Sequence, residues 1–259
     1  MDWAHSLAGL FVGLLVGMTG VGGGALMTPL LVLLFGVAPA TAVGTDLWFA
    51  ALTKSVGGVV HSRSGTVDWE VVQRLCWGSL PAALVTLLAL HFLGAGKSGG
   101  VLVHALGAVL ILTAVAMVFK KLFHAFGQQL RTRLPENFKR AQPALTVFAG
   151  ALLGVLVSLT SIGAGALGAV MLVYLYPFRM KPTRLVGTDI VHAIPLTIVA
   201  GTGHLLMDNV DLVLLATLLA GSIPGILVGS LISTRAPELV LRMLIALALV
   251  AAGAKMLSA

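Results

Sequence analysis

The sequence predicts an all-α polytopic membrane protein made of two inverted-topology repeats. Three observations predict this class: a bilayer-like composition, apolar runs of membrane-spanning length, and a match between the two halves of the chain. Of the 259 residues, 58% are hydrophobic and 10% are charged. Soluble chains carry about 25% charged residues, so the composition excludes a disordered chain, a collagen and an ordinary soluble domain.

The chain is basic, with 16 Lys and Arg against nine Asp and Glu and a formal charge of +7. In a soluble protein this excess would suggest a nucleic-acid partner, but in a membrane protein the positive-inside rule explains it, so no nucleic acid is predicted. Cys76 is the only cysteine, which excludes an intramolecular disulfide and a multi-cysteine metal, haem or iron–sulfur site. The first residues lack the basic region and cleavage site of a signal peptide, so the N-terminus is predicted to be retained.

Eight apolar runs contain few charges, and six of them have the length of about 20 residues that a helix needs to cross the hydrocarbon. The runs at 5–36 and 144–176 are longer, at about 32 residues, and as straight helices they would reach about 48 Å. Each contains glycines near its middle, so each is predicted to form two half-length helices joined by a glycine-rich break. The six single spans are predicted at 40–60, 71–93, 100–119, 184–207, 211–233 and 238–257.

The second half of the chain repeats the first. A shift of 141 residues aligns Thr19 with Thr160, and after a two-residue insertion a shift of 143 aligns Asp46 with Asp189. Several matched residue types are rare in lipid, so the match indicates an internal duplication. The other matches include Gly22, Gly24, Val43, Gly44, Thr45, Gly58, His61, Val67, Asp68, Gly78, Ser79 and Pro81 with Gly163, Gly165, Val186, Gly187, Thr188, Gly201, His204, Val210, Asp211, Gly221, Ser222 and Pro224.

The distribution of Lys and Arg on the two sides of the membrane indicates whether the two repeats have parallel or inverted topology. If every run crosses once, the Lys and Arg outside the membrane divide nine to six, which is a weak bias. If each broken run is a re-entrant hairpin and the central basic segment is cytoplasmic, 13 of these 15 lie inside, and only Lys97 and Lys255 lie outside. Each repeat is then a Gly-broken re-entrant helix hairpin plus three transmembrane helices, and both termini lie outside. The predicted units are a first repeat at 1–123, a basic cytoplasmic connecting loop at 124–143 and a second repeat at 144–259.

Glycine clusters open the second helix of each hairpin. Such a cluster leaves several backbone N–H groups without intrahelical partners and directs the positive end of the helix dipole at the break, which favours an anion. No Walker lysine or preceding strand is present, so nucleotide binding is rejected. Close helix packing is the alternative role for the glycines. The predicted substrate-binding residues in these segments are Thr19, Gly22, Gly23, Gly24, Thr160, Ser161, Gly163 and Gly165.

Charged and polar residues inside the predicted spans extend this site. Asp46 and Asp189 each follow a Gly-Thr pair and are either helix caps or groups that couple transport to protons or another ion. Lys54, eight residues after Asp46, attracts the anion, bridges to Asp46 through other groups, or extends toward the cytoplasmic surface. The pair of Gly-Thr threonines, Thr45 and Thr188, completes the predicted substrate contacts.

His61 and His204 are either structural caps at loops or pH-responsive gates. His192 lies within the span predicted at 184–207 and is expected to line a cavity. His91, His104 and His124 show no metal-ligand spacing with one another, and no catalytic triad, zinc motif or redox pair occurs. We therefore expect no enzyme activity, cofactor or metal.

Three motifs taken together resemble the TauE/SafE sulfite exporter family of bacterial membrane transporters. They are Gly-Val-Gly-Gly-Gly-x4-Pro at 20–29, Ala-Val-Gly-Thr at 42–45 and His-x3-Gly-x-Val-Asp-Trp at 61–69, and the resemblance covers nearly the whole chain. It implies a small sulfur-containing anion, such as sulfite, a sulfonate or sulfoacetate, and a place in the bacterial inner membrane. The chain departs from the family where acidic residues follow Gly-Thr and where Val170 takes the place of Pro29.

The resulting expectation is a secondary transporter of a small anion that works by alternating access, has its site between the two hairpin tips and is coupled to protons. Its partners are the substrate and the lipid bilayer. An anion channel and a membrane scaffold or assembly factor without a substrate are the alternatives. The sequence gives neither the direction of transport nor the oligomeric state.

Overall fold

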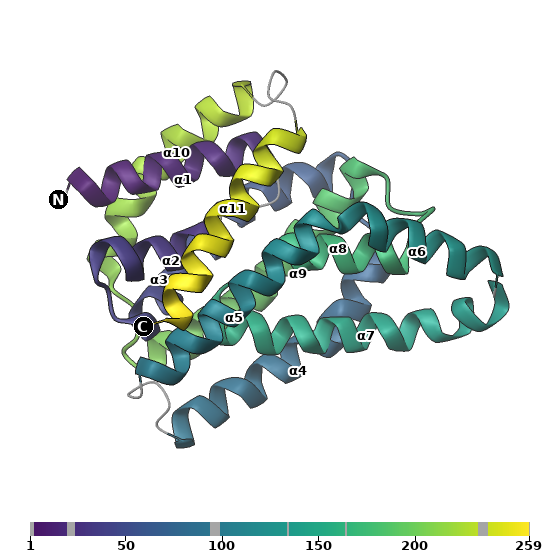
Figure 1. Cartoon of the computed structure of the whole chain (residues 1–259), viewed down its shortest axis with the longest axis horizontal. Coiled ribbons are helices and arrows are strands. Elements are labelled where there is room, and N and C mark those ends of the chain that lie inside the picture. Colours follow the sequence, from purple (N-terminus) through teal and green to yellow (C-terminus); the bar gives the residue numbers. More distant parts are fainter. Residues whose placement is uncertain are drawn as a thin grey trace.

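The computed structural model describes residues 3–19, 24–93, 99–133, 135–163, 165–232 and 238–258, and the regular elements in these ranges are all α-helices (Figure 1). The all-α expectation is therefore confirmed. In chain order the helices are α1 (Trp3–Thr19), α2 (Gly24–Phe35), α3 (Pro39–Arg63), α4 (Trp69–Leu93), α5 (Gly99–Val118), α6 (Lys120–Arg133), α7 (Pro135–Thr160), α8 (Ala166–Leu175), α9 (Pro182–Leu206), α10 (Leu212–Ile232) and α11 (Glu238–Leu257).

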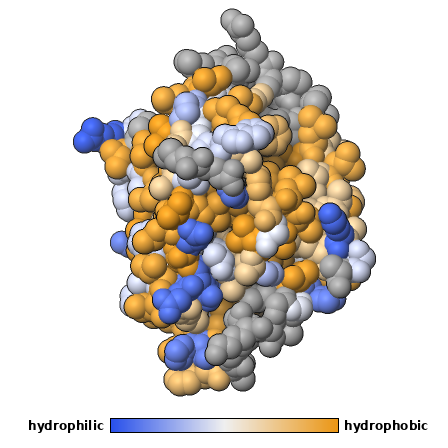
Figure 2. Space-filling model, turned by 90° about the vertical axis from the view of Figure 1, so that its left-hand side faces the viewer, coloured by the Kyte–Doolittle hydropathy of each residue, from blue (hydrophilic) through white to orange (hydrophobic). Residues whose placement is uncertain are grey.

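Four stretches of helix are long and apolar enough to cross a bilayer, at Trp69–Phe92, Glu136–Thr160, Pro182–Leu206 and Leu212–Gly229. A fifth is added if α5 and α6, which are bent by 65° at a short break, form one broken or re-entrant element. Hydrophobic residues cover much of the surface in Figure 2, and large side chains such as Trp77 and Phe92 are exposed. Lipid accepts such a surface, and the chain is a multi-pass membrane protein.

The helix α3 is not among these four although it has 25 residues. It carries Asp46 and Lys54, which are both buried and which lower its mean hydropathy. The sequence prediction of an ordinary apolar span at 40–60 is therefore too simple. The helix α3 differs from an ordinary apolar span because its charged side chains lie inside the protein, away from lipid.

The segment at 124–143 is helical rather than a loop, which corrects the sequence prediction. It forms most of α6 and the first turns of α7. One side of α6 is held against the protein, because Gly127 lies against the backbone of Tyr174 and His124 Nε2 is 2.9 Å from the carbonyl oxygen of Pro177. The basic residues in this segment had suggested only a cytoplasmic loop that connects the two repeats.

The second long apolar run is broken where the glycines predict, because α7 ends at Thr160 and the 10-residue α8 begins at Ala166. In the first run α1 ends at Thr19 and the 12-residue α2 begins at Gly24, and the predicted break between them lies outside the described residues. The first arm of the second run is longer than a half-helix, because α7 has 26 residues and begins in the basic segment. The return of each pair to its side of entry stays a prediction.

The most extensive helix contacts join the two halves of the sequence, with α1 along α10, α4 along α7, α3 along α9 and α5 along α11. The α1–α10 and α7–α4 contacts use matched residues. A Cβ added at Gly9 would lie 2.2 Å from the carbonyl oxygen of Leu218, and one at Gly150 would lie 2.2 Å from that of Leu75. Small residues thus let these helix backbones approach closely in both places.

Candidate transport site

The break between α7 and α8 is a turn that only certain residues can form. Gly163 and Gly165 have φ values of 124° and 141°, which side chains with a Cβ rarely adopt. Thr160 stabilises the turn, since its Oγ1 donates to the carbonyl oxygen of Leu156 at 2.6 Å and accepts from the backbone N–H of Ile162 at 3.1 Å. The helix α8 then begins at Ala166, so the N–H groups of its first turn face the break, and that of Gly168 donates to the carbonyl oxygen of Gly163 at 3.1 Å.

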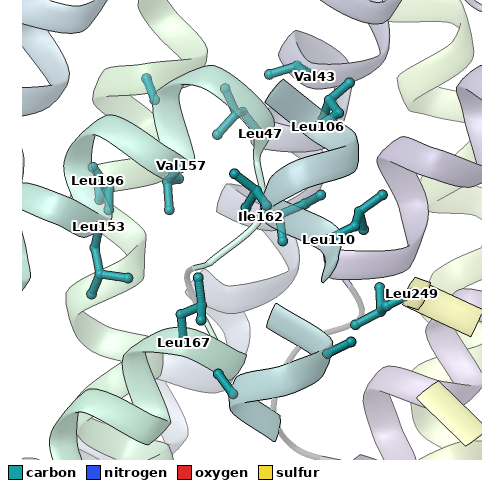
Figure 3. Close-up of a cluster of buried hydrophobic side chains, with 14 of the residues drawn as sticks. Val43, Leu47, Leu106, Leu110, Leu153, Val157, Ile162, Leu167, Leu196 and Leu249 are labelled. Carbon is teal, nitrogen blue, oxygen red and sulfur yellow. The ribbon is translucent and has the colours of Figure 1, made fainter. Parts of the chain in front are cut away.

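The break lies inside the protein. Ile162 is fully buried, and Figure 3 shows it on the connection between the helices, among Val157, Leu110 and other apolar side chains. The preceding residue Ser161 is also buried, with a φ of 58° that is unusual for a residue with a side chain. Its hydroxyl has no hydrogen-bond partner among the residues that the structure describes.

Asp46 of α3 lies near the first turns of α2 and near the α7–α8 break. It is fully buried, and its Oδ2 accepts a hydrogen bond of 2.6 Å from Thr28 Oγ1 in the first turns of α2. Ser161 is close enough to interact with the same carboxyl group. The other oxygen, Oδ1, has no hydrogen-bond partner in the described part of the chain. Thr28 was not predicted to belong to the site, although it is the only hydroxyl between the first glycine cluster and Pro29.

Asp189 of α9 has the matching position in the second half, and its surroundings differ. Its Oδ1 lies against the start of α8, where a Cβ added at Gly168 would be 2.2 Å away. The charge of Lys54 acts on it. Lys54 is buried and also acts on Asp46 and on His192. The structure therefore brings both predicted coupling carboxylates and the predicted cation into one electrostatic group.

His192 adds a buried imidazole to this group. Its Nε2 is 3.0 Å from Ser79 Oγ of α4, and within the described ranges its Nδ1 has no partner. The residue is 1% exposed. From the sequence, His192 had been expected only to line a cavity of the second half.

The threonines of the two Gly-Thr pairs form hydrogen bonds with the residues that precede two other helices. Thr188 Oγ1 accepts from the backbone N–H of Asp68 before α4, and Thr45 Oγ1 accepts from that of Asp211 before α10. The Asp211 carboxylate in turn accepts from the N–H groups of the first turn of α10. These contacts give Thr45 and Thr188 a structural role, and their predicted contact with substrate stays a prediction.

The predicted gating histidines also make structural contacts. His61 Nδ1 is 2.9 Å from Thr66 Oγ1 in the loop after α3. His204 is buried, and its Nε2 is 2.9 Å from the carbonyl oxygen of Ser158. These contacts agree with the capping interpretation, and a gating role for either histidine stays a prediction.

The first glycine cluster lies largely outside the described residues, which resume at Gly24. Gly22 and Gly23, both predicted to bind substrate, fall in this gap. Thr19 is the last residue of α1 and Gly24 the first of α2, so both adjoin the break. Within the described ranges, no group of three or more His, Cys, Asp or Glu is placed to hold a metal ion.

An ion-pair cluster at one end of the fold had not been predicted. Arg179, in the connection between α8 and α9, binds the buried Asp68 carboxylate with two nitrogens, at 2.5 and 2.7 Å, and Glu70 at 2.7 Å. Arg184 lies 3.6 Å from Asp68, and Arg74 pairs with Glu70. The hydrogen bond from Arg179 lowers the pKa of Glu70, and the charges of Arg179 and Arg74 act in the same direction. The basic run at 179–184 was the available signal, but its acidic partners are about 110 residues away in sequence.

Membrane-spanning helices, a surface suited to lipid and charged groups buried between helices together indicate a membrane transporter. Residues 6–256 match the family Sulfite exporter TauE/SafE, and the chain belongs to this family. It is a membrane transporter of this family and not an enzyme.

Curated relatives carry the same general description. The probable membrane transporter protein YjnA of Bacillus subtilis is 42% identical over 254 residues, which cover 97% of this chain and 98% of the relative. The probable membrane transporter protein YdhB of the same organism is 27% identical over 239 residues, covering 89% of this chain and 90% of that one. A third relative, the probable membrane transporter protein YunE, is 45% identical over 58 residues, covering 22% and 21% of the two chains. No solved structure matches the chain.

Proposed function

We propose that the chain is a secondary transporter of a small anion, a sulfur oxyanion or an organosulfonate, with its site between the α1–α2 and α7–α8 breaks. Transport proceeds by alternating access and is coupled to protons. The observation that carries the proposal is the buried α7–α8 break, where the N-terminus of α8 lies close to the Ser161 hydroxyl, which has no hydrogen-bond partner among the described residues. Both are donors that an oxyanion accepts from.

Charge supports an anionic substrate that arrives with a proton. Asp46 and Asp189 with Lys54 carry a net charge of −1 if all three are ionised, and this would repel an anion. One proton makes the group neutral and removes this repulsion. Binding of anion and proton together is therefore favoured over binding of the anion alone.

The proposed architecture is two inverted repeats, at 1–123 and 144–259, around this site. The matched α1–α10 and α7–α4 contacts and the paired bonds of Thr45 and Thr188 support an internal two-fold arrangement. We place the chain in the bacterial inner membrane with the basic segment at 124–143 in the cytoplasm and both termini outside. In this topology the ion-pair cluster of Asp68 and Arg179 lies at the cytoplasmic end.

The test is binding to purified protein in detergent, measured by thermal shift with sulfite, thiosulfate, sulfate, sulfoacetate, taurine and short carboxylates at two pH values. Ser161→Ala removes the unpartnered hydroxyl at the break, and Ser158→Ala removes an equally buried and unpartnered hydroxyl one helical turn before it. We expect one class of anion to raise the melting temperature in the wild type and in Ser158→Ala, and not in Ser161→Ala. Equal loss in both variants, or equal retention, would contradict a site at this break.

Two other functions predict different results. A channel shares the site but conducts without proton dependence or saturation, which flux into proteoliposomes distinguishes. A scaffold or assembly factor binds none of the anions, and substitutions at the glycine breaks disturb its folding without any selective loss of flux. Folded wild-type protein that no anion stabilises would favour the scaffold, or a cationic or neutral substrate bound by Asp46 and Asp189.

A further inference from the structure

His192 is a buried polar residue at a position where the other half of the chain has an apolar one. It lies on α9, is 1% exposed, and matches Phe49 of α3 under the shift of 143 residues. Phe49 is equally buried, in an apolar cluster with Val12 and Leu31. A purely apolar ring is therefore sufficient for packing at this place in the repeat, and the nitrogens of His192 need a separate explanation.

The hydroxyl of Ser79 on α4 contacts His192 rather than its own helix. Its Oγ is 3.0 Å from His192 Nε2, and this is its only hydrogen bond with the described residues. The matched serine of α10, Ser222, instead bonds the carbonyl oxygen of Leu219 in its own helix at 3.4 Å. Both serines are fully buried, so the two hydroxyls differ in what they contact and not in their exposure. Ser79 therefore holds one nitrogen of the imidazole in place.

The hydrogen bonds of this pair favour one tautomer of the imidazole. A neutral imidazole carries its hydrogen on one nitrogen, and a hydroxyl needs an acceptor for its own hydrogen. If Ser79 donates to Nε2, the ring hydrogen is on Nδ1, and it is the only hydrogen of the pair without an acceptor among the described residues. If Nε2–H donates to Ser79 instead, the Ser79 hydrogen lacks an acceptor there and Nδ1 lacks a donor. Unsatisfied buried groups cost free energy, so the first arrangement is favoured.

His192 lies between two residues of α9 that contact the region of the α7–α8 break. Asp189, three residues earlier, lies against the start of α8, where a Cβ at Gly168 would be 2.2 Å from its Oδ1. Leu196, four residues later, packs in the apolar cluster that includes Ile162 of the break (Figure 3). Residues three and four apart share one face of a helix. His192 is therefore on the side of α9 that faces the proposed site.

We propose that Nδ1–H of His192 donates a hydrogen bond to an oxygen of the transported anion, and that Ser79 is a positioning residue that keeps this hydrogen on Nδ1. The inference rests on the proposed function for the nature of the ligand, and it adds a donor from α9 to those at the α7–α8 break. An oxyanion fits this buried donor, because a hydrogen bond to a charged acceptor is about twice as strong as one between neutral groups.

Two substitutions separate a contact through Nδ1 from a structural role through Nε2. The amide nitrogen of asparagine takes the place of Nδ1, whereas that of glutamine takes the place of Nε2. In thermal shift with the anion that stabilises the wild type, we expect His192→Asn to bind nearly as well as the wild type. His192→Gln should bind about 10- to 100-fold more weakly, since it loses one hydrogen bond to a charged group. Equal binding by the two variants, or the opposite order, would overturn the proposal.

Ser79→Ala tests the positioning role. Loss of the hydroxyl leaves the ring hydrogen of His192 free to move to Nε2, so we expect the dissociation constant of the anion to rise about tenfold. Ser222→Ala is the matched control, because its hydroxyl bonds only its own helix among the described residues, and it should bind the anion like the wild type. A purely structural role of Ser79 would lower the melting temperature without anion and leave the dissociation constant unchanged, which would contradict the positioning role.

Nitrogen NMR of protein with isotope-labelled histidine identifies the tautomer without a transport assay. The chain has seven histidines, and the signals that disappear in His192→Asn belong to His192. We expect its hydrogen on Nδ1 in the wild type, distributed over both nitrogens in Ser79→Ala, and unchanged in Ser222→Ala. A wild-type ring with its hydrogen on Nε2 would overturn the proposal. The Nδ1 signal should also move when the anion is added, which tests the contact even if His192→Gln fails to fold.

The two proposals fail in distinguishable ways. If the wild type binds an anion and His192→Gln binds it equally well, the role of His192 fails and the proposed function stands. If the wild type binds none of the anions, the proposed function fails and the contact of His192 with an anion fails with it. The hydrogen position seen by NMR then still decides whether Ser79 donates to Nε2.

Discussion

Thr188 Oγ1 accepts a hydrogen bond of 3.0 Å from the backbone N–H of Asp68, 120 residues away in the sequence. Thr45, which matches Thr188, makes the same contact with Asp211 at 3.1 Å. The preceding glycine allows the loop to approach, since a Cβ at Gly44 would lie 2.0 Å from the carbonyl oxygen of Asn209. The repeated Gly-Thr-Asp motif therefore combines two functions: Gly-Thr holds the start of a helix from the other half, and Asp faces a helix break.

Thr188→Val should lower the free energy of unfolding by about 1–3 kcal/mol, because it leaves the buried N–H of Asp68 without its acceptor. Thr188→Ser keeps the hydroxyl and should stay near the wild type. Thermal unfolding in detergent, without substrate, measures both. If Thr188→Val is as stable as Thr188→Ser, the hydrogen bond is not the reason for threonine at this position.

Gly221→Ala should disrupt the packing of α1 against α10. A Cβ at this position would lie 1.8 Å from the carbonyl oxygen of Ser6, so the two helices must separate, at a cost of about 1–3 kcal/mol. Gly100→Ala is the control, because a Cβ at Gly100 in α5 meets nothing within 4 Å of it. It should stabilise the helix slightly, by up to about 1 kcal/mol. Equal stability of the two variants would show that α1 and α10 do not need this close approach.

The sequence predicts the parts of this fold that depend on local composition. Glycines such as Gly163 and Gly165 have the positive φ values of the break, and the matched Thr160 and Asp189 lie where the duplication indicates. The pairing of four first-half helices with helices of the second half, α1 with α10, α3 with α9, α4 with α7 and α5 with α11, was not predicted. It depends on contacts between distant residues, such as Gly9 with Leu218, which no local pattern reveals.

The parts of the site that sequence reasoning missed are those where the duplication is imperfect. Thr28 differs from Ala169, the residue that matches it in the second half, so a comparison of shared residues did not single it out. The helix α6 was missed for another reason. Its basic ends suggested a loop, whereas its contacts through Gly127 and His124 with the end of α8 and the connection that follows it support a helix.

Asp68→Asn should destabilise the cluster that joins α4 to the connection after α8. The Asp68 carboxylate is 2% exposed and accepts two hydrogen bonds from Arg179, with Arg184 close by. Charge-assisted bonds contribute about 1.5–3 kcal/mol, and the partly exposed arginines place the expected loss toward the lower end. Glu70→Gln is the matched control, because Glu70 is 50% exposed and its pairs should contribute less than about 1 kcal/mol. A larger loss in Glu70→Gln than in Asp68→Asn would contradict this ranking.

The same cluster predicts a dependence of stability on pH. The hydrogen bond from Arg179 lowers the pKa of Glu70 below its ordinary value of 4.5, so the folded state binds this proton less readily than the unfolded state does. The contribution of Glu70 to stability is therefore fully present above pH 4.5 and is lost as the pH falls through the lowered pKa of the folded state. Glu70→Gln should be less stable than the wild type at neutral pH, and the difference should disappear in acid. Thermal unfolding of both proteins from neutral to acidic pH, at low and high salt, measures this difference. Because Glu70 is exposed, high salt should also reduce the difference in stability between the two proteins. A difference in stability that grows as the pH falls would show that this ion pair does not stabilise the fold.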